Sequence, residues 1–288
     1  MFIEIIKAAL MGIVEGITEW LPISSTGHMI LLEQLVRFRA SDAFIEMFRV
    51  VIQLGAILAV VLLYFDRLWP FKKPAAPAEG GEAPKGLLAW CDGPKWLLWA
   101  KILVASLPAA LIGLPLDDWM DEHLYNAPVV ALMLILYGVF FILIEDHRRR
   151  PRIVRMDQLT FRHALIIGIW QVLALIPGTS RSGATIVGGM LLGTSRPLAA
   201  QFTFYLAIPV MFGASGLKLV KFFAGGNSFG GTEIAILLVG MAVAFAVSVV
   251  AIRFLMNYVK KHTFKAFGWY RIFLGALVLS LAFWQSVL

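Results

Sequence analysis

Long apolar segments dominate this chain and constrain its fold more than any other feature. Six of them are long enough to cross a bilayer core, which takes about 20 helical residues, and they lie near 45–65, 97–115, 128–145, 198–222, 234–256 and 267–287. Because the bilayer core offers no water to the backbone, spans of this length form α-helices. The chain is 60% hydrophobic, whereas a soluble domain is about half apolar. The sequence therefore predicts an all-α polytopic integral membrane protein.

Two further apolar segments, 1–36 and 160–194, are each interrupted in the middle by a proline. Pro22 interrupts the first segment and Pro177 the second. Proline removes a helical hydrogen bond and pushes the preceding residue out of the α region. We therefore expect each segment to form two half-helices that meet at a break.

The charged connections predict the topology. Three basic connections are placed in the cytoplasm: 146–162, 66–95 and 257–265. The connection 116–127 carries four acidic residues and no lysine or arginine, so it is placed outside. These sides alternate correctly only if both broken segments are re-entrant hairpins. The first hairpin then enters from outside and the second from the cytoplasm, with both termini outside. The Pro- and Gly-rich stretch 74–86 is typical of a flexible linker.

The two broken segments resemble each other. Three pieces align, with one inserted residue: Gly12-Ile-Val-Glu15 with Gly168-Ile-Trp-Gln171, Pro22 with Pro177, and Ser25-Thr26-Gly27 with Arg181-Ser182-Gly183. We predict two repeats, 1–145 (hairpin 1–36, three spans and the cytoplasmic linker 66–95) and 146–288 (hairpin 160–194 and three spans). Because each repeat holds an odd number of spans, the repeats are inverted. Such repeats place a binding site near the middle of the membrane, where the breaks meet.

Charge and cysteine content exclude other classes of protein. The net charge of +7 comes from basic residues in short loops, which is typical of positive-inside signals and contact with anionic membrane lipids, so no nucleic-acid partner is expected. Cys91 is the only cysteine, which excludes an internal disulfide. The first apolar run contains Glu15 and Glu19 and no small-residue cleavage site follows it, so we do not expect a cleaved signal peptide.

The first break concentrates polar groups at bilayer depth, where ionisable side chains mark functional sites. Glu15 and Glu19 are four residues apart and share a helix face. Two such carboxylates cannot both ionise cheaply, so either one is protonated or a cation bridges them. Three hydroxyl residues and a histidine follow Pro22: Ser24, Ser25, Thr26 and His28.

The second break repeats this pattern with a positive charge. Thr179 and Ser180 precede a half-helix that contains Arg181. Hydroxyl residues are preferred N-caps, and a helix N-terminus offers free N–H groups and a positive dipole end. Two helix starts and an arginine that converge at mid-depth predict a phosphate site.

Structural roles compete with this hypothesis. Serine and threonine in membrane helices commonly bond to their own backbone, and glycines permit close helix packing. Glu19 and Arg181 are harder to explain in this way, because each would be an unpaired buried charge without the other or a ligand. A structural scaffold would leave these charges unexplained. A lipid-phosphate flippase remains the alternative, because secondary transporters share this architecture.

The two polar stretches closely resemble the signature motifs of bacterial undecaprenyl-diphosphatase, the bacitracin-resistance family. Those motifs are Glu/Gln-x-x-x-Glu followed by Pro-x-Ser-Ser-Thr-Gly-His, and Pro-Gly-x-Ser-Arg-Ser-x-x-Thr, and this chain has every defined position. The resemblance extends through 51–55 and covers nearly the whole chain. The stretch 74–94 resembles an insertion relative to shorter members of the family. The other major class of lipid phosphatases has a histidine at a fixed distance after a Ser-Arg pair. No histidine lies at that distance after Arg181 or Arg196, which argues against that class.

The resemblance implies a hydrolase that converts undecaprenyl diphosphate into undecaprenyl phosphate and inorganic phosphate. It implies recycling of the lipid carrier for peptidoglycan and other cell-wall polymers, bacitracin resistance, and dependence on a divalent cation, Mg²⁺ or Ca²⁺. It also implies a multi-pass protein of the bacterial inner membrane whose site opens to the periplasm. We also consider a homodimer, although the sequence carries no signal of oligomeric state.

We expect Ser25 to be the nucleophile, with Ser24 as second candidate and Glu19 or His28 as the base. Direct attack by water is the alternative. Arg181 would stabilise charge on the phosphate, and Glu15 and Glu19 would act in catalysis or hold the cation. The expected phosphate-binding residues are Ser24, Thr26, Ser180, Ser182, Thr185 and Gln171.

Overall fold

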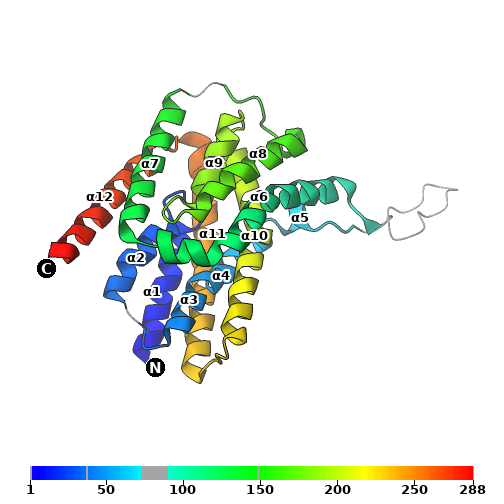
Figure 1. Cartoon of the computed structure of the whole chain (residues 1–288). Helices are drawn as coiled ribbons and strands as arrows, with labels where there is room; N and C mark the ends of the chain where they lie inside the picture. The colour runs from blue at the N-terminus through cyan, green and yellow to red at the C-terminus, as the bar shows by residue number, and fades with distance from the viewer. Residues whose placement is uncertain (1, 37, 73–89, 148–149, 288) are drawn as a thin grey trace.

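The computed structural model describes residues 2–36, 38–72, 90–147 and 150–287 (Figure 1). Its regular secondary structure in these ranges consists of helices and two isolated β-bridges. Its helices are α1 (Phe2–Thr18), α2 (Ser25–Leu35), α3 (Asp42–Val51), α4 (Gln53–Leu63), α5 (Phe65–Leu68), α6 (Gly93–Leu124), α7 (Ala127–Asp146), the 3-10 helix η2 (Met156–Gln158), α8 (Phe161–Val172), the 3-10 helix η3 (Leu173–Leu175), α9 (Arg181–Leu191), α10 (Arg196–Ala224), α11 (Gly231–Lys261) and α12 (Lys265–Val287). The predicted linker 74–86 lies outside the described residues.

The six predicted spans are confirmed. Helices long and apolar enough to cross a membrane occupy Asp42–Leu63, Gly93–Leu116, Ala127–Asp146, Arg196–Ala224, Gly231–Lys261 and Lys265–Trp284. The N-terminus and the α10–α11 connection lie at one end of the molecule, and the C-terminal end of α7 lies at the other (Figure 1). The chain is therefore a multi-pass, all-α membrane protein.

Two spans differ in detail from the prediction. The first is divided into α3 and α4 at Ile52, which keeps right-handed helical dihedral angles, so the direction of the chain is preserved. The second, α6, contains Pro108 and Pro115 and continues to Leu124. Membrane helices tolerate proline where neighbouring groups satisfy the freed carbonyls. Most of the acidic segment 116–127 is therefore helical rather than a loop.

Both broken segments form helix–break–helix hairpins. The first comprises α1 and α2, and the second comprises α8, η3 and α9. Ser24 and Ser180 have φ of 71° and are, within the described ranges, the non-glycine residues with positive φ. Each caps the helix that follows: the Ser24 hydroxyl accepts from the Gly27 amide, and the Ser180 hydroxyl accepts from the Gly183 amide. Ser25 is thus the first residue of α2 and Arg181 the first residue of α9, and the two positions are equivalent, as the alignment predicts.

Helix packing follows the inverted repeat. The contact of α1 with α11 corresponds to the contact of α8 with α6. The contact of α4 with α11 likewise corresponds to the contact of α10 with α6. The corresponding helices α7 and α12 pack on each other. The aligned glycines Gly12 and Gly168 permit the close contacts, because an added Cβ would lie 2.6 Å from the Gly240 oxygen and 2.3 Å from the Ala105 oxygen. The two breaks are in direct contact, because Arg181 donates to Glu19 and Ser182 donates to the Leu21 carbonyl oxygen. The division of the repeats at residue 145 stays a prediction.

Candidate active site

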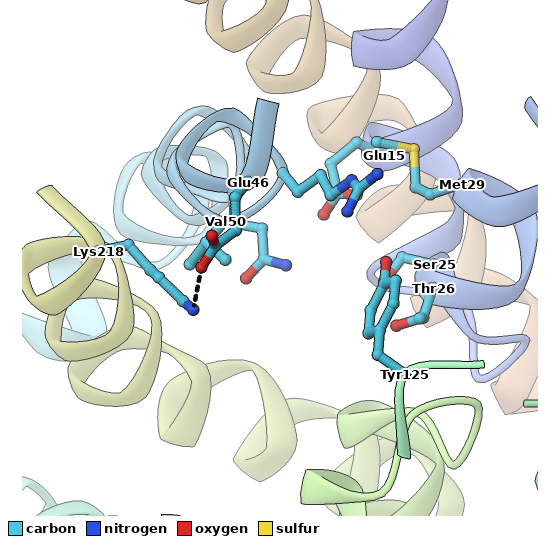
Figure 2. Close-up of a pocket in the computed structure, with 10 residues that line it drawn as sticks. Glu15, Ser25, Thr26, Met29, Glu46, Val50, Tyr125 and Lys218 are labelled. Carbon is cyan, nitrogen blue, oxygen red and sulfur yellow. Dashed lines mark hydrogen bonds and ion pairs between the residues drawn. The ribbon is translucent and has the colours of Figure 1, made fainter. Parts of the chain in front are cut away.

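A cavity of about 320 Å³ lies beside the first break. Glu15, Ser25 and Thr26 of the first hairpin line it, as does Tyr125 between α6 and α7. In Figure 2, Ser25, Thr26 and Tyr125 face Glu46 and Lys218 across the open space. The structure therefore brings part of the predicted polar cluster to one cavity.

Ser25, Glu19 and Arg181 form a continuous chain of contacts. The Ser25 hydroxyl donates to Glu19 Oε2 over 2.8 Å, and Arg181 Nη2 donates to Glu19 Oε1 over 3.2 Å. Both charged side chains are largely buried, with 8% and 11% of their side-chain surfaces exposed. Arg181 Nη1 also donates to the Thr203 carbonyl oxygen, and the guanidinium lies 5.8 Å from the centre of the Trp20 ring. A hydroxyl at a helix start, a carboxylate acceptor and a cation thus share one location.

Glu15 and Gln171, which occupy aligned positions, are both buried. Glu15 Oε1 and both polar side-chain atoms of Gln171 have no hydrogen-bond partner in the described part of the chain. A buried polar group without a partner is costly, and a ligand or ion is one explanation for it. Glu15 lines the cavity, and its unpartnered oxygen is buried in the cavity wall.

The remaining hydroxyl residues predicted to bind phosphate mainly order the start of α9 in this structure. Ser180 caps the helix and hydrogen-bonds Ser182, and Ser182 donates to the Leu21 carbonyl oxygen across to the first break. Thr185 donates to the Arg181 carbonyl oxygen and hydrogen-bonds Thr203. Ser24 likewise caps α2 and is buried. These contacts fix the backbone around Ser25 and Arg181.

His28 faces away from the Ser25–Glu19 contact. Its Nδ1 hydrogen-bonds the Ser24 carbonyl oxygen, and its Nε2 hydrogen-bonds the Tyr270 hydroxyl, each over 2.7 Å. The two rings also stack, with centres 5.6 Å apart. Both ring nitrogens are therefore engaged, and the geometry favours Glu19 over His28 as the group that accepts the Ser25 proton.

The cavity also holds charged residues to which the sequence analysis assigned no role. Lys218 of α10 donates to Glu46 of α3 over 2.8 Å, and Arg49 lies 5.6 Å from the centre of the Tyr125 ring. All three charged residues lie inside predicted spans. The rule that ionisable residues at bilayer depth mark a site, which singled out Glu15 and Glu19, applies equally to them.

The oxygen-rich lining fits a hard cation that is shared with a phosphate substrate. Within the described ranges, no cluster of three or more His, Cys, Asp or Glu side chains could hold a metal ion. Mg²⁺, however, is usually bound by one or two carboxylates together with substrate phosphates. Glu15 has a free oxygen for this role, whereas Glu19 is engaged by Ser25 and Arg181. The donor chemistry therefore favours Glu15 as the main protein ligand.

Comparison with known proteins gives a consistent result over the whole chain. The family model described as Bacitracin resistance protein BacA matches residues 8–277. The undecaprenyl-diphosphatase of Enterococcus faecalis is 54% identical over 281 residues, which cover 97% of this chain and 98% of that protein. That of Acetivibrio thermocellus is 57% identical over 278 residues, covering 96% and 97%, respectively. That of Lactococcus lactis subsp. lactis is 54% identical over 288 residues, covering 99% of both chains. By its sequence over nearly its full length, this chain belongs to the Bacitracin resistance protein BacA family.

Proposed function

We propose that this chain hydrolyses undecaprenyl diphosphate to undecaprenyl phosphate and inorganic phosphate. This reaction recycles the lipid carrier for peptidoglycan and other cell-wall polymers and confers bacitracin resistance. The observation that carries the proposal is the 2.8 Å hydrogen bond from the Ser25 hydroxyl to Glu19, at a helix start that opens onto the cavity. A binding site alone needs anion-binding groups, whereas a serine held by a carboxylate is suited to nucleophilic attack.

In the proposed reaction, Ser25 Oγ forms a bond to the terminal phosphorus while Glu19 accepts the serine proton. The bond between that phosphorus and the bridging oxygen breaks, and undecaprenyl phosphate leaves. Water then hydrolyses the phosphoserine, which releases inorganic phosphate and restores the serine hydroxyl. Direct attack by water, with Glu19 as its base, is the alternative that uses the same residues.

Arg181 is suited to stabilise the phosphate as its charge develops. In the structure its Nη2 donates to Glu19, and its Nε is buried without a hydrogen-bond partner in the described part of the chain. When Glu19 accepts the serine proton, it loses the negative charge that holds Arg181. The guanidinium then becomes available to the equatorial oxygens of the phosphate, where an arginine contributes most to this chemistry.

A divalent cation, Mg²⁺ or Ca²⁺, would be held by Glu15 and the substrate phosphates, with Glu19 as a second candidate ligand. When bound, it neutralises phosphate charge, which lowers the barrier to attack by an electron-rich oxygen. Glu15 orients the substrate from the side of the cavity opposite Lys218 (Figure 2). This role accounts for the unpartnered Glu15 oxygen.

We place the protein in the bacterial inner membrane, with the cavity open to the periplasm. Tyr125 at the cavity lies in the connection whose acidic composition predicts an external location. The prenyl chain of the substrate stays in the outer leaflet while its diphosphate reaches Ser25. The positive-inside pattern and the position of Tyr125 support this orientation.

Phosphate release by purified protein in detergent tests the proposal. With no second compartment present, a flippase has no net activity, whereas a phosphatase releases inorganic phosphate from polyprenyl diphosphate and added Mg²⁺ or Ca²⁺. We expect Ser25→Ala to abolish the release of phosphate. Ser106→Ala should retain it, since the Ser106 hydroxyl donates to the Ile102 carbonyl oxygen of its own helix. Well-folded protein that releases no phosphate would instead support the flippase.

A further inference from the structure

Arg271 of α12 is completely buried and contacts both helix breaks. Its Nη1 donates to the Pro22 carbonyl oxygen over 3.2 Å. Its Nη2 donates to the carbonyl oxygens of Gly178 and Thr179, each over 2.9 Å. One side chain therefore bonds to two backbone segments that lie more than 150 residues apart in the sequence.

The surroundings of Arg271 consist of backbone carbonyls rather than a carboxylate. Within the described ranges it takes part in no ion pair, and its other contacts are the Met133 and Leu134 carbonyl oxygens and the Tyr137 ring. A buried arginine is costly unless its donors are satisfied, and its planar fork of five N–H groups can serve several acceptors at once. Its surroundings thus match the donor geometry of a guanidinium.

Comparison of the two repeats indicates that packing alone does not explain why this position holds an arginine. An added Cβ on Gly183 would lie 3.3 Å from Arg271 Nη1, and one on the equivalent Gly27 would lie 3.0 Å from Leu134 Cδ1. Leu134 of α7 therefore occupies the place in the first repeat that Arg271 occupies in the second. An apolar side chain is sufficient on one side of the pseudo-two-fold axis, whereas the other side has a cation that bonds to both breaks.

We propose that Arg271 is a positioning residue for the phosphatase reaction. Pro22 lies three residues before Ser25, and Thr179 lies two residues before Arg181. By bonding to both carbonyls, Arg271 fixes the separation of the two helix starts, so that Ser25 and Arg181 meet on the same carboxylate, Glu19. Arg271 does not touch the substrate in this role. The inference rests on the proposed function for its kinetic readout.

The test compares Arg271→Leu and Arg271→Lys with wild type and with Arg253→Leu, a control at an exposed position of α11. Leucine reproduces the residue at the equivalent position, and lysine keeps the charge but not the planar fork. We expect kcat to fall about 10²-fold in both Arg271 variants, because a misplacement of about 1 Å can cost that much. KM should change less than about threefold, because the residue does not bind substrate.

Two further measurements separate positioning from a general loss of folding. Hydrogen exchange should show faster exchange at 19–29 and at 176–186 together, with the rest of α12 unchanged. In a double-mutant cycle with Arg181→Ala, the loss caused by Arg271→Leu should be much smaller than in wild type, because the residue acts through Arg181 and Ser25.

Folded Arg271→Leu or Arg271→Lys protein with wild-type kcat would overturn the inference, as would additive losses in the cycle. If Arg271→Leu does not fold, kcat and exchange in Arg271→Lys decide the question by the same criteria. Phosphate release by wild type and Arg253→Leu tests the proposed function itself. Its absence there is distinguishable from a failure confined to the Arg271 comparison.

Discussion

Ser24 and Ser180 share one backbone conformation, with φ of 71° in both, although they belong to opposite halves of the chain. With ψ of 104° and 122°, the two serines lie in a sparsely populated backbone region, which costs about 1–3 kcal/mol at a non-glycine residue. In each case the strained serine caps the helix that follows, and the next residue is a proposed active-site residue, Ser25 or Arg181. The same turn, used twice, therefore directs two helix starts toward one carboxylate.

Ser25→Ala tests the serine mechanism. We expect kcat to fall by roughly 10⁴-fold or more, because removal of a nucleophile leaves only binding and electrostatic stabilisation. Trapping of a 32P-labelled phosphoserine at Ser25 in a rapidly quenched wild-type reaction would give direct evidence. Near wild-type kcat in Ser25→Ala would instead exclude Ser25 as the nucleophile.

Arg181→Ala should lose on the order of 10²–10⁴-fold in kcat, since the guanidinium is expected to stabilise developing phosphate charge. Arg181→Lys should recover little of this loss, because lysine lacks the bidentate fork. Steady-state kinetics on a polyprenyl diphosphate measures both variants. A higher KM with unchanged kcat would show that Arg181 binds the ground state only.

Removal of divalent cations by EDTA should abolish phosphate release, and added Mg²⁺ or Ca²⁺ should restore it. Glu15→Gln should raise the Mg²⁺ concentration for half-maximal activity by at least about 10-fold, because loss of a ligand weakens metal binding at least as much as loss of a supporting group. Gln171, the aligned amide, indicates that glutamine is tolerated sterically in such a position. Full activity in EDTA would refute the cation requirement, and an unchanged Mg²⁺ dependence would exclude Glu15 as a ligand.

Gly55→Ala should destabilise the packing of α4 on α11. An added Cβ would lie 2.1 Å from the Met241 carbonyl oxygen, and overpacking of this kind costs about 1–3 kcal/mol. Thermal unfolding in detergent measures the change. Gly216→Ala is the matched control, because in the described part of the chain no atom outside its own helix backbone and chain neighbours lies within 4 Å of its Cβ position. Equal unfolding temperatures for the two variants would contradict the close approach of these helices.

Cysteine labelling tests the topology. In a Cys91→Ala background, an impermeant maleimide should label Glu122→Cys from outside and Arg150→Cys only after the membrane is opened. Both positions are exposed, so accessibility depends on the side of the membrane. Labelling of both from the same side would contradict the re-entrant topology.

The spans and the breaks could be predicted from the sequence because they depend on local properties, namely apolar length and the missing N–H of proline. The contact between Glu19 and Arg181 could also be anticipated, because buried opposite charges without other partners tend to pair. The equivalence of Ser25 and Arg181 followed from the short alignment of the two breaks. These features needed no knowledge of which helices pack together.

The direction of His28 and the role of Arg271 could not be predicted in this way. His28 lies on the same short helix as Ser25, but its ring is held by Tyr270, 242 residues away in the sequence. Arg271 is a single arginine in a predicted span, and only the packing of α12 against α7 shows that its donors reach two breaks. The division at Ile52 and the helical extension of α6 depend on similar tertiary context.

The buried charges at the breaks are divided by sign between the repeats. Glu15 and Glu19 come from the first half of the chain, and Arg181 and Arg271 come from the second. Each half alone would place two side chains of the same charge type at bilayer depth with no opposite partner, which is strongly unfavourable. The two halves have thus become electrostatically complementary and can no longer substitute for each other. The symmetry that remains is a symmetry of the backbone, and two copies of either half could not rebuild this site.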